Sequence, residues 1–513
     1  MPLAVIRRIV VDGCRRGRFV RRRRDCHSQR LEWVGRINNR ADQLKGMAMA
    51  RIEKDFLGEK ELPDDAYYGV QTLRGKENFH ITGIPMSAEP YFVKAFGYVK
   101  KAAALANRDL GVLDGRIADA IVGACDRLIA GELCDQFVTD FIQGGAGTST
   151  NMNANEVIAN LALESLGYRK GEYQYLNPND HVNYGQSTND VYPTAFRLAL
   201  ILRLASYMDA LRQLQAAFQA KAGEFERVLK MGRTHLQDAV PMSLGQEFNG
   251  WATTIGEEVS RLGEVRQLLH EINLGATAIG TSVTAAPGYP ELATRHLSEL
   301  TGTRFILAGD LVEATSDTGA YVQLSGVLKR TAAKLTKICN DIRMLASGPR
   351  CGLNEINLPQ MQPGSSIMPG KVNPVIPEVV NQTSFLVIGL DLTVTLAASA
   401  GQLQLNVMEP VITFALFTSI FTMENAVTSL RVNCVQGITA NAERTRQMVL
   451  NSLGIVTVLK PILGYRQCAE IAREGYESGK SLQQIVVGER RLLSPEQWDE
   501  IFSFENLISP QSE

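Results

Sequence analysis

Long stretches of this chain repeat apolar residues at intervals of three and four, which is the spacing of one face of an α-helix. Four such runs stand out, at 196–218, 248–269, 324–345 and about 377–400, and the last is apolar on most sides. Alternation with a period of two is scarce, and no internal repeat stands out. The pattern therefore predicts a mainly α body.

The length of these runs also carries information about assembly. Helices of about thirty residues are about 45 Å long, which exceeds what one compact domain needs. Such helices usually bury their faces in a bundle, and often in a bundle that several subunits share. We therefore expect a long-helix bundle in the middle of the chain.

Composition excludes several classes of protein. The chain has 513 residues, of which 45% are apolar and 21% charged, as in soluble globular proteins. Residues 1–46 hold 13 of the 53 basic and 4 of the 54 acidic residues, so this head carries +9 and the remaining body −10. An acidic body binds nucleic acid poorly. Because the longest apolar run, near 385–400, contains Asp391, no uncharged membrane span is expected.

The basic head, residues 1–46, includes four consecutive arginines at 21–24. It is Arg-rich and acid-poor like a transit peptide, but it has little Ser and lacks the apolar core of a secretory signal. A nucleic-acid-binding arm and a non-native upstream start are the other interpretations. Met47 and Met49 precede the first segment with ordinary hydrophobic patterning. We therefore favour a non-native upstream start and expect residues 1–46 to be disordered.

Cysteine usage indicates neither a metal site nor a disulfide framework. The eight cysteines are widely spread, without a CxxC pair or a Cys/His cluster. Reduced, mostly buried thiols are typical of a cytoplasmic protein, which is the predicted location.

Four polar motifs precede predicted helices, at 144–151, 186–190, 232–238 and 364–374. Each offers hydroxyl or amide groups beside the free backbone N–H groups at the positive end of a helix, which suits an anion. For any one motif, simple N-capping is the plainer explanation. Four together, with His235 and Lys371 among them, favour a converging site for a small, doubly charged acid.

The last motif, GSSIMPGKVNP, is the most specific. Its two glycines allow hinge-like backbone angles and its prolines limit the rest, as in a loop that closes over a substrate. Lys371 supplies a positive charge for a carboxylate. The adjacent Ser365 and Ser366 should have different tasks, because neighbouring side chains point apart, and Ile367 and Met368 are expected to be buried.

The segment GSSIMPGKVNP resembles the signature of the fumarase/aspartase superfamily, and the likeness covers about residues 50–513. Three stretches resemble the aspartase branch, namely LNPNDH at 176–181, NEINLP at 354–359 and GQLQLNVMEP at 401–410. Fumarases typically carry His in place of Asn177, and Gly and Ser in place of Asn354 and Asn357. The resemblance therefore favours aspartase over fumarase.

The resemblance implies a mainly α, three-domain fumarase/aspartase-like fold with a central long-helix bundle shared across a homotetramer. The expected units are an N-terminal domain at 47–187, the bundle at 188–442 and a small helical C-terminal domain at 443–513. It also implies active sites built from three different subunits, which agrees with helices too long for one domain.

The implied reaction is the reversible anti-elimination of ammonia from L-aspartate to give fumarate and ammonium, through an aci-carboxylate intermediate. No organic cofactor or bound metal is implied, and activation by a divalent cation is left open. The alternatives are a fumarase, which hydrates fumarate to L-malate, and a catalytically silent, crystallin-like structural homologue. The intact set of Ser365, Lys371 and Asn373 argues against a silent homologue.

The resemblance also assigns roles to individual side chains. Ser365 corresponds to the base that removes the Cβ proton. Three further groups would hold the substrate: Thr148, Ser187, Thr188 and Ser366 around the side-chain carboxylate; Thr234, Lys371 and Asn373 on the α-carboxylate; and Asn189 and His235 around the amino group. His235 is expected to be neutral and tuned by Glu378, although Glu378 could simply favour the helix dipole. Because some aspartases carry Gln at this position, His235 is not expected to be indispensable.

Overall fold

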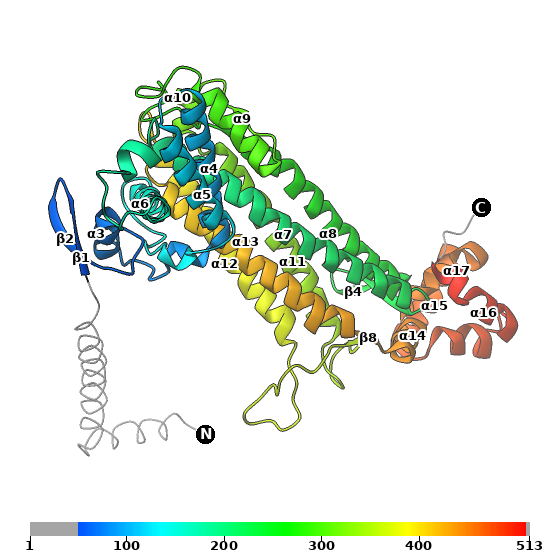
Figure 1. Cartoon of the computed structure of the whole chain (residues 1–513). Coiled ribbons are helices and arrows are strands. Elements are labelled where there is room, and N and C mark those ends of the chain that lie inside the picture. The colour runs from blue at the N-terminus through cyan, green and yellow to red at the C-terminus, as the bar shows by residue number, and fades with distance from the viewer. Residues whose placement is uncertain (1–49, 509–513) are drawn as a thin grey trace, which may run out of the picture.

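Five long helices run side by side through the middle of the molecule (Figure 1). They are α7 (Thr188–Glu224), α8 (Leu244–Arg266), α11 (Gly319–Leu345), α12 (Val375–Ser399) and α13 (Glu409–Asn433). In this computed structural model, which describes residues 50–508, α7 packs on α8 and α13, while α12 packs on α11 and α13. The four predicted helical runs and the mainly α fold are confirmed. The basic head lies outside the described residues.

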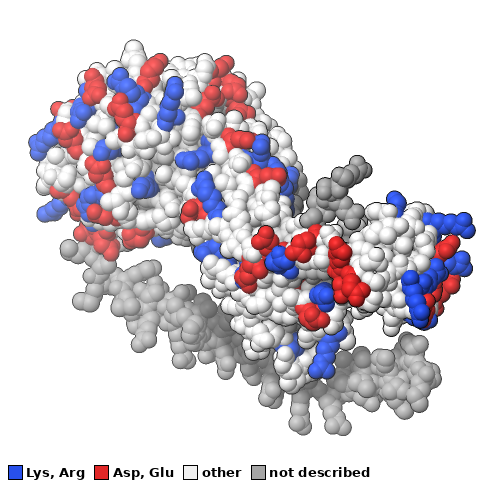
Figure 2. Space-filling view, turned by 90° about the vertical axis from the view of Figure 1, so that its right-hand side faces the viewer, with Lys and Arg blue, Asp and Glu red and all other residues white. Residues whose placement is uncertain are grey.

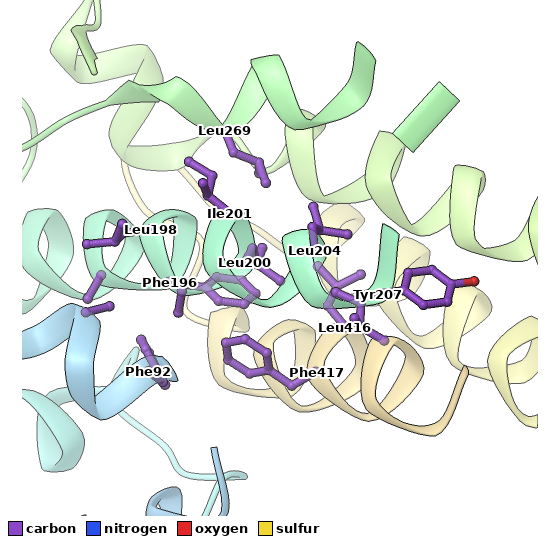
Figure 3. Packing of buried hydrophobic residues seen from close by; sticks show 14 of the residues in the cluster. Phe92, Phe196, Leu198, Leu200, Ile201, Leu204, Tyr207, Leu269, Leu416 and Phe417 are labelled. Atoms are coloured by element: carbon purple, nitrogen blue, oxygen red, sulfur yellow. The ribbon is translucent and has the colours of Figure 1, made fainter. Parts of the chain in front are cut away.

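Helix α7 forms the centre of this bundle because its apolar positions follow the predicted spacing. Figure 3 shows Phe196, Leu200 and Leu204 of α7 packed among Phe92 and Phe417. All five side chains are almost fully buried. Burying one such side chain contributes roughly 1.5–3 kcal/mol, so the repeated contacts fix the direction of α7.

Pro193 lies inside α7, beyond the opening turn in which a proline is best tolerated. It is the sixth residue of the helix, and a proline there cannot donate a hydrogen bond to the carbonyl of Asn189. The side chain of Asn273 supplies the missing donor, with its Nδ2 3.0 Å from that carbonyl oxygen. A residue from the connection after α8 therefore completes the start of α7.

Replacing Asn273 by Ala should destabilise the protein by about 1–3 kcal/mol, because the carbonyl of Asn189 loses its donor. The midpoint of thermal unfolding measures this loss. The substitution Pro193→Ala restores a backbone N–H that can donate to the same carbonyl. Asn273→Ala should therefore lower the midpoint of thermal unfolding less in a chain that already carries Pro193→Ala. Equal losses in both backgrounds would contradict this explanation.

The N-terminal part packs around one end of the bundle (Figure 1). It contains a hairpin of β1 (Ala50–Asp55) and β2 (Gly58–Pro63), followed by α3 (Val70–Asn78), α4 (Pro90–Asp109), α5 (Gly115–Ile129), α6 (Thr148–Ser165) and the short π-helix η5 (Pro178–Val182). Between α8 and α11 lie β5 (Glu271–Ile272), α9 (Tyr289–Thr301), β6 (Ile306–Leu307) and α10 (Leu311–Ser316). Helices α4 and α5 pair with each other, and α4 also packs on α7 and α9.

A small helical lobe occupies the other end of the molecule (Figure 1). Its helices are α14 (Ala442–Asn451), α15 (Lys460–Ser478), α16 (Pro495–Ile501) and α17 (Phe504–Ile508). Its hydrophobic core also takes Leu229 and Met231 from the antiparallel hairpin of β3 (Leu229–Thr234) and β4 (Gln237–Ser243). Nearby, β7 (Ile356–Asn357) pairs with β8 (Thr439–Ala440). The first two predicted domains share one core, so the three-domain division stays a prediction.

Helix α12 leaves a second apolar face uncovered. It packs inward with Val380, Val387 and Val394, whereas Phe385, Leu386, Leu392 and Leu396 are between 47% and 61% exposed. By length and composition alone, α12 and 409–437 could each cross a membrane, and a bent pair at 442–478 could form a third span. Both helices contain acidic residues, in agreement with the expectation that the chain has no uncharged span of this length.

Charged side chains are mixed on the face that Figure 2 shows. The described Lys and Arg residues there alternate with Asp and Glu and form no continuous basic stripe. A nucleic-acid-binding face would need such a stripe. The lack of nucleic-acid binding stays a prediction.

Candidate active site

The first part of the candidate site lies where α6 begins. The motif at 144–151 was predicted to precede a helix. Thr148 is the first residue of α6, so the second half of the motif lies within the helix. Gly147, with φ of 92°, makes this entrance possible, since a Cβ atom there would lie 2.3 Å from the ring of Tyr192. The side chain of Thr148 is exposed beside this entrance.

The second polar motif forms the start of α7. Ser187 caps the helix, as the plainer interpretation predicted: its Oγ accepts from the N–H of Asn189, and Asp190 accepts from the N–H of Ser187. The other oxygen of Asp190 accepts from the N–H groups of Gly275 and Thr277. Burial raises the pKa of Asp190 to about 7. This carboxyl group therefore ties the start of α7 to the loop after β5.

These two entrances share one cavity of about 410 Å³. Thr148, Ser187 and Thr188 line it, as their predicted common role requires. Five amide side chains without a predicted role also line it, namely Gln71, Asn151, Asn179, Asn183 and Gln186. Ser366 was also predicted to hold the side-chain carboxylate, but it does not line this cavity and belongs to the loop at 364–374. Asn189 lies at the edge, where its Nδ2 donates to the carbonyl of Ala278 at 2.8 Å.

The loop at 364–374 is closed at its neck by hydrogen bonds. The N–H of Gly364 donates to the carbonyl of Lys371 at 2.7 Å, and Asn373 Nδ2 donates to the carbonyl of Gly364 at 2.8 Å. A Cβ atom on Gly364 would lie 2.8 Å from Asn373 N, so only glycine fits there. Ser365 Oγ accepts from the N–H groups of Ile367 at 3.2 Å and Met368 at 3.0 Å. Two donors therefore face the hydroxyl of the expected base.

The predicted burial of Ile367 and Met368 is wrong for the single chain. Their exposed fractions are 84% and 48%, because the loop stands away from the bundle and no described segment covers it. Ser366 is also exposed. This part of the site is open in one chain.

Side chains from the end of the loop and the start of α12 line a cavity of about 880 Å³. Lys371, Asn373 and Glu378 lie on its wall together with Arg343, Asn354 and Asn357. The last two are residues whose identity separates the aspartase branch from the fumarases. Glu378 lies 3.8 Å from the guanidinium of Arg343, and no described contact joins it to His235. The expected Glu378–His235 pair therefore does not form within one chain.

Thr234 and His235 lie on a β-hairpin rather than at a helix entrance, which corrects the prediction for 232–238. Residues 237–243 pair as strand β4 before α8 begins, so the motif forms the turn. His235 and Leu236 both have left-handed backbone angles, with φ of 55° and 62°, which costs roughly 1–2 kcal/mol for each non-glycine residue. Arg233 and Glu355, 2.6 Å apart, help to hold the base of this strained turn.

One chain keeps these parts far apart. Helix α7 has 37 residues, so it is about 55 Å long, and Thr188 is its first residue. Near its other end, Lys221 Nζ donates to the carbonyl of Ile438, beside the β7–β8 pair. Asn357 of β7 lines the cavity that contains Lys371. Thr188 and Lys371 of the same chain therefore cannot contact one small molecule.

Residues 50–508 contain neither a cluster of metal ligands nor a disulfide. No group of three or more His, Cys, Asp or Glu side chains in that range is arranged to hold a metal ion. The six cysteines in it are free thiols, and four of them are buried. Burial raises the pKa of Cys434 to about 12, which keeps that thiol protonated and unreactive.

Comparison with known proteins adds an independent line of information. The model of a family described as lyase matches residues 58–389, and that of the fumarase C C-terminus matches residues 455–509. The chain is 55% identical to the aspartate ammonia-lyase of Escherichia coli (strain K12) over 461 residues, which cover 90% of this chain and 96% of that protein. It is 57% identical to the aspartate ammonia-lyase of Pseudomonas aeruginosa over 469 residues, which cover 91% and 99%.

Solved structures have the same fold. A fumarate lyase:delta crystallin from Brucella melitensis, crystallised with cobalt bound, is 52% identical, with a TM-score of 0.88 over 90% of this chain and 100% of that one. A class II fumarase from Schistosoma mansoni is 35% identical, with a TM-score of 0.85 over 90% of this chain and 100% of that one.

Proposed function

The chain belongs to the lyase family whose model spans residues 58–389, and we propose that it is an aspartate ammonia-lyase. The observation that carries this proposal is an identity of 55–57% to aspartate ammonia-lyases over about nine-tenths of the chain. The class II fumarase is only 35% identical over a similar span. The reaction eliminates ammonia from L-aspartate and leaves fumarate.

The proposed chemistry begins at the Cβ–H bond. Ser365 takes the proton, and the electron pair of that bond moves into the neighbouring carboxylate to form a doubly negative aci-carboxylate. The pair then forms the C=C bond while the Cα–N bond breaks and ammonia leaves. Ser365 is a weak base, so the N–H groups of Ile367 and Met368 support the proposal, because donors at Ser365 Oγ stabilise its alkoxide.

Hydrogen-bond donors around the side-chain carboxylate of the substrate, where the negative charge develops, supply the other large contribution to catalysis. We assign this role to Thr148, Ser187, Thr188 and Ser366. One such preorganised donor is typically worth about 3–4 kcal/mol when it faces charge that develops in the transition state. Thr234, Lys371 and Asn373 would hold the α-carboxylate. His235 and Asn189 would surround the amino group.

A site of this composition requires more than one chain. We propose a homotetramer in which Thr188 of one subunit, His235 of another and Ser365 of a third meet. The 37-residue α7 supports this arrangement, because it separates Thr188 and Lys371 within each chain. The uncovered face of α12 also supports it, since Phe385, Leu392 and Leu396 would pack on helices of other subunits. Such burial also explains an apolar helix without a membrane.

Lys371→Met should raise KM for L-aspartate roughly 10- to 100-fold, because a charge-assisted hydrogen bond to the α-carboxylate is lost. Initial rates over a range of L-aspartate concentrations measure this. Lys480→Met is a control for loss of a surface charge, since Lys480 pairs with Glu489 in the C-terminal lobe. An unchanged KM in Lys371→Met would contradict the assigned role.

The proposed substrates and products are L-aspartate, fumarate and ammonium, and the proposed location is the cytoplasm. No organic cofactor or resident metal is part of the proposal. Initial rates before and after treatment with EDTA would measure any activation by a divalent cation.

The decisive experiment follows the absorbance of fumarate formed by the full chain. Formation from L-aspartate and not from L-malate supports the proposal. Formation from L-malate alone would instead identify a fumarase, which is the second candidate. His235 is compatible with either enzyme. Silence with both substrates would favour a structural, crystallin-like protein.

A further inference from the structure

A fully buried lysine lies directly beneath the cavity that contains Thr188. We propose that Lys100 is a positioning residue of the reaction, which orients a chain of amide side chains so that the Thr188 hydroxyl donates to the substrate carboxylate. This inference rests on the proposed function and names a residue that takes part without touching the substrate.

The environment of Lys100 is unusual for a structural lysine. It lies on the inner face of α4, among alanine and valine residues, and its exposed fraction is 0%. No carboxylate among the described residues forms an ion pair with it. Its Nζ donates instead to Asn183 Oδ1 at 2.9 Å and to Gln186 Oε1 at 2.8 Å. Because a buried amine is costly, an apolar side chain would fill this space with less loss.

The two acceptors of Lys100 belong to the candidate active site. Asn183 and Gln186 both line the cavity of about 410 Å³, and Gln186 directly precedes Ser187. Asn183 Oδ1 also accepts from the side-chain amides of Asn151 and Asn155, each at 3.1 Å. Three donors therefore converge on one oxygen, which fixes the orientation of the Asn183 amide.

The fixed amide determines which way the next hydrogen bonds point. Asn151 uses one Nδ2 hydrogen for Asn183 and can use the other for Thr188 Oγ1, at 3.2 Å. Since the Thr188 oxygen accepts this bond, its own proton is free to donate into the cavity. The direction of donation thus follows from Lys100, through Asn183 and Asn151, to an anion beside Thr188.

The electrostatic surroundings agree with this role. The titratable groups that act on Lys100 are Asp190 of α7 and Cys125 of α5, and burial lowers the pKa of Lys100 to about 7. The amine donates to Asn183 and Gln186 whether or not it carries the extra proton. A dicarboxylate in the cavity favours the charged form, so substrate binding strengthens the same hydrogen bonds.

The test compares Lys100→Met with Lys101→Met in the full chain. Lys101 is the adjacent residue, but it faces outward and pairs with Asp126 at 2.5 Å, so it controls for loss of a lysine from α4. Lys100→Met should lower kcat/KM for L-aspartate roughly 10- to 100-fold, the range expected for losing charge-assisted hydrogen bonds. Lys101→Met should remain near wild type.

A double-mutant cycle separates positioning from simple packing. Thr188→Val removes the hydroxyl at nearly constant shape. In a chain that carries Thr188→Val, Lys100→Met should therefore lower kcat/KM for L-aspartate less than about threefold. Equal factors in both backgrounds, or a Lys100→Met variant that behaves like Lys101→Met, would overturn the inference.

Two further measurements keep the inference testable. If Lys100→Met does not fold, Asn151→Ala breaks the same chain one residue later, and wild-type turnover in that variant would overturn the inference. Calorimetric titration with fumarate needs no turnover, and weaker binding by Lys100→Met supports the role. Failure of the wild-type chain to convert L-aspartate would contradict the proposed function instead, so the two failures are distinguishable.

Discussion

Replacing Ser365 by Ala is expected to lower kcat for L-aspartate by at least about a thousandfold, within the range for losing a general base. The structure gives the physical reason for singling out this serine, since two backbone N–H groups face its Oγ. Alanine keeps the loop backbone and its closed neck between Gly364 and Asn373. Affinity for fumarate should therefore stay within a few-fold of wild type.

Fumarate absorbance measures turnover of the Ser365→Ala variant, calorimetry its affinity for fumarate, and light scattering its assembly. Ser478→Ala is a suitable control, because Ser478 is exposed at the end of α15, where it donates to the carbonyl of Glu474 and accepts from the N–H of Lys480. Turnover by Ser365→Ala near the wild-type level would remove Ser365 from the mechanism. Loss of assembly as well as turnover would show that the loop has a structural role instead.

Mixing two inactive variants should restore activity. If each site takes Ser365 and Thr188 from different subunits, random tetramers of Ser365→Ala and Thr188→Val chains contain native pairs at up to about a quarter of their sites. Thr188→Val alone should lose roughly 100- to 1,000-fold in kcat, as expected for one missing donor at a developing negative charge. The mixture should therefore exceed both parents by far.

Co-expression of the two chains with different affinity tags yields the mixed assembly, and initial rates measure its activity. The matched control mixes Ser365→Ala with Lys371→Met. Both changes lie in the loop at 364–374, so no site can combine two native copies, and the rate at low L-aspartate concentration should not exceed the average of the two parents. Mixed Ser365→Ala and Thr188→Val assemblies with only the average rate of their parents would exclude a shared site.

The local elements were predictable because they depend on neighbouring residues. The spacing of Phe196, Leu200 and Leu204 predicts one buried helix face, and α7 has that face. Ser187 was recognisable as a cap because its oxygen reaches an N–H group only two residues later. The need for glycine at 364 is likewise local, because a Cβ atom there would meet Lys371 and Asn373 of the same loop.

The wrong predictions involve contacts outside the motif itself. The motif at 232–238 was interpreted as a helix entrance, but residues 237–243 pair with β3 and turn it into a hairpin. The sequence around Pro193 likewise does not reveal that Asn273, eighty residues later, donates to the carbonyl that the proline leaves free. Ile367 is exposed because no other part of the described chain covers the loop.

The helices, the cap at Ser187, the loop at 364–374 and the family resemblance can be predicted from the sequence, because they depend on periodicity and short motifs. Where the motifs lie relative to one another depends on packing between distant segments. The direction and length of α7 separate Thr188 from Lys371, and the pairing of α4 with α7 places Lys100 beneath Thr188. In the sequence nothing distinguishes Lys100 from its neighbour Lys101, since the role of Lys100 depends on amide groups that folding brings to it.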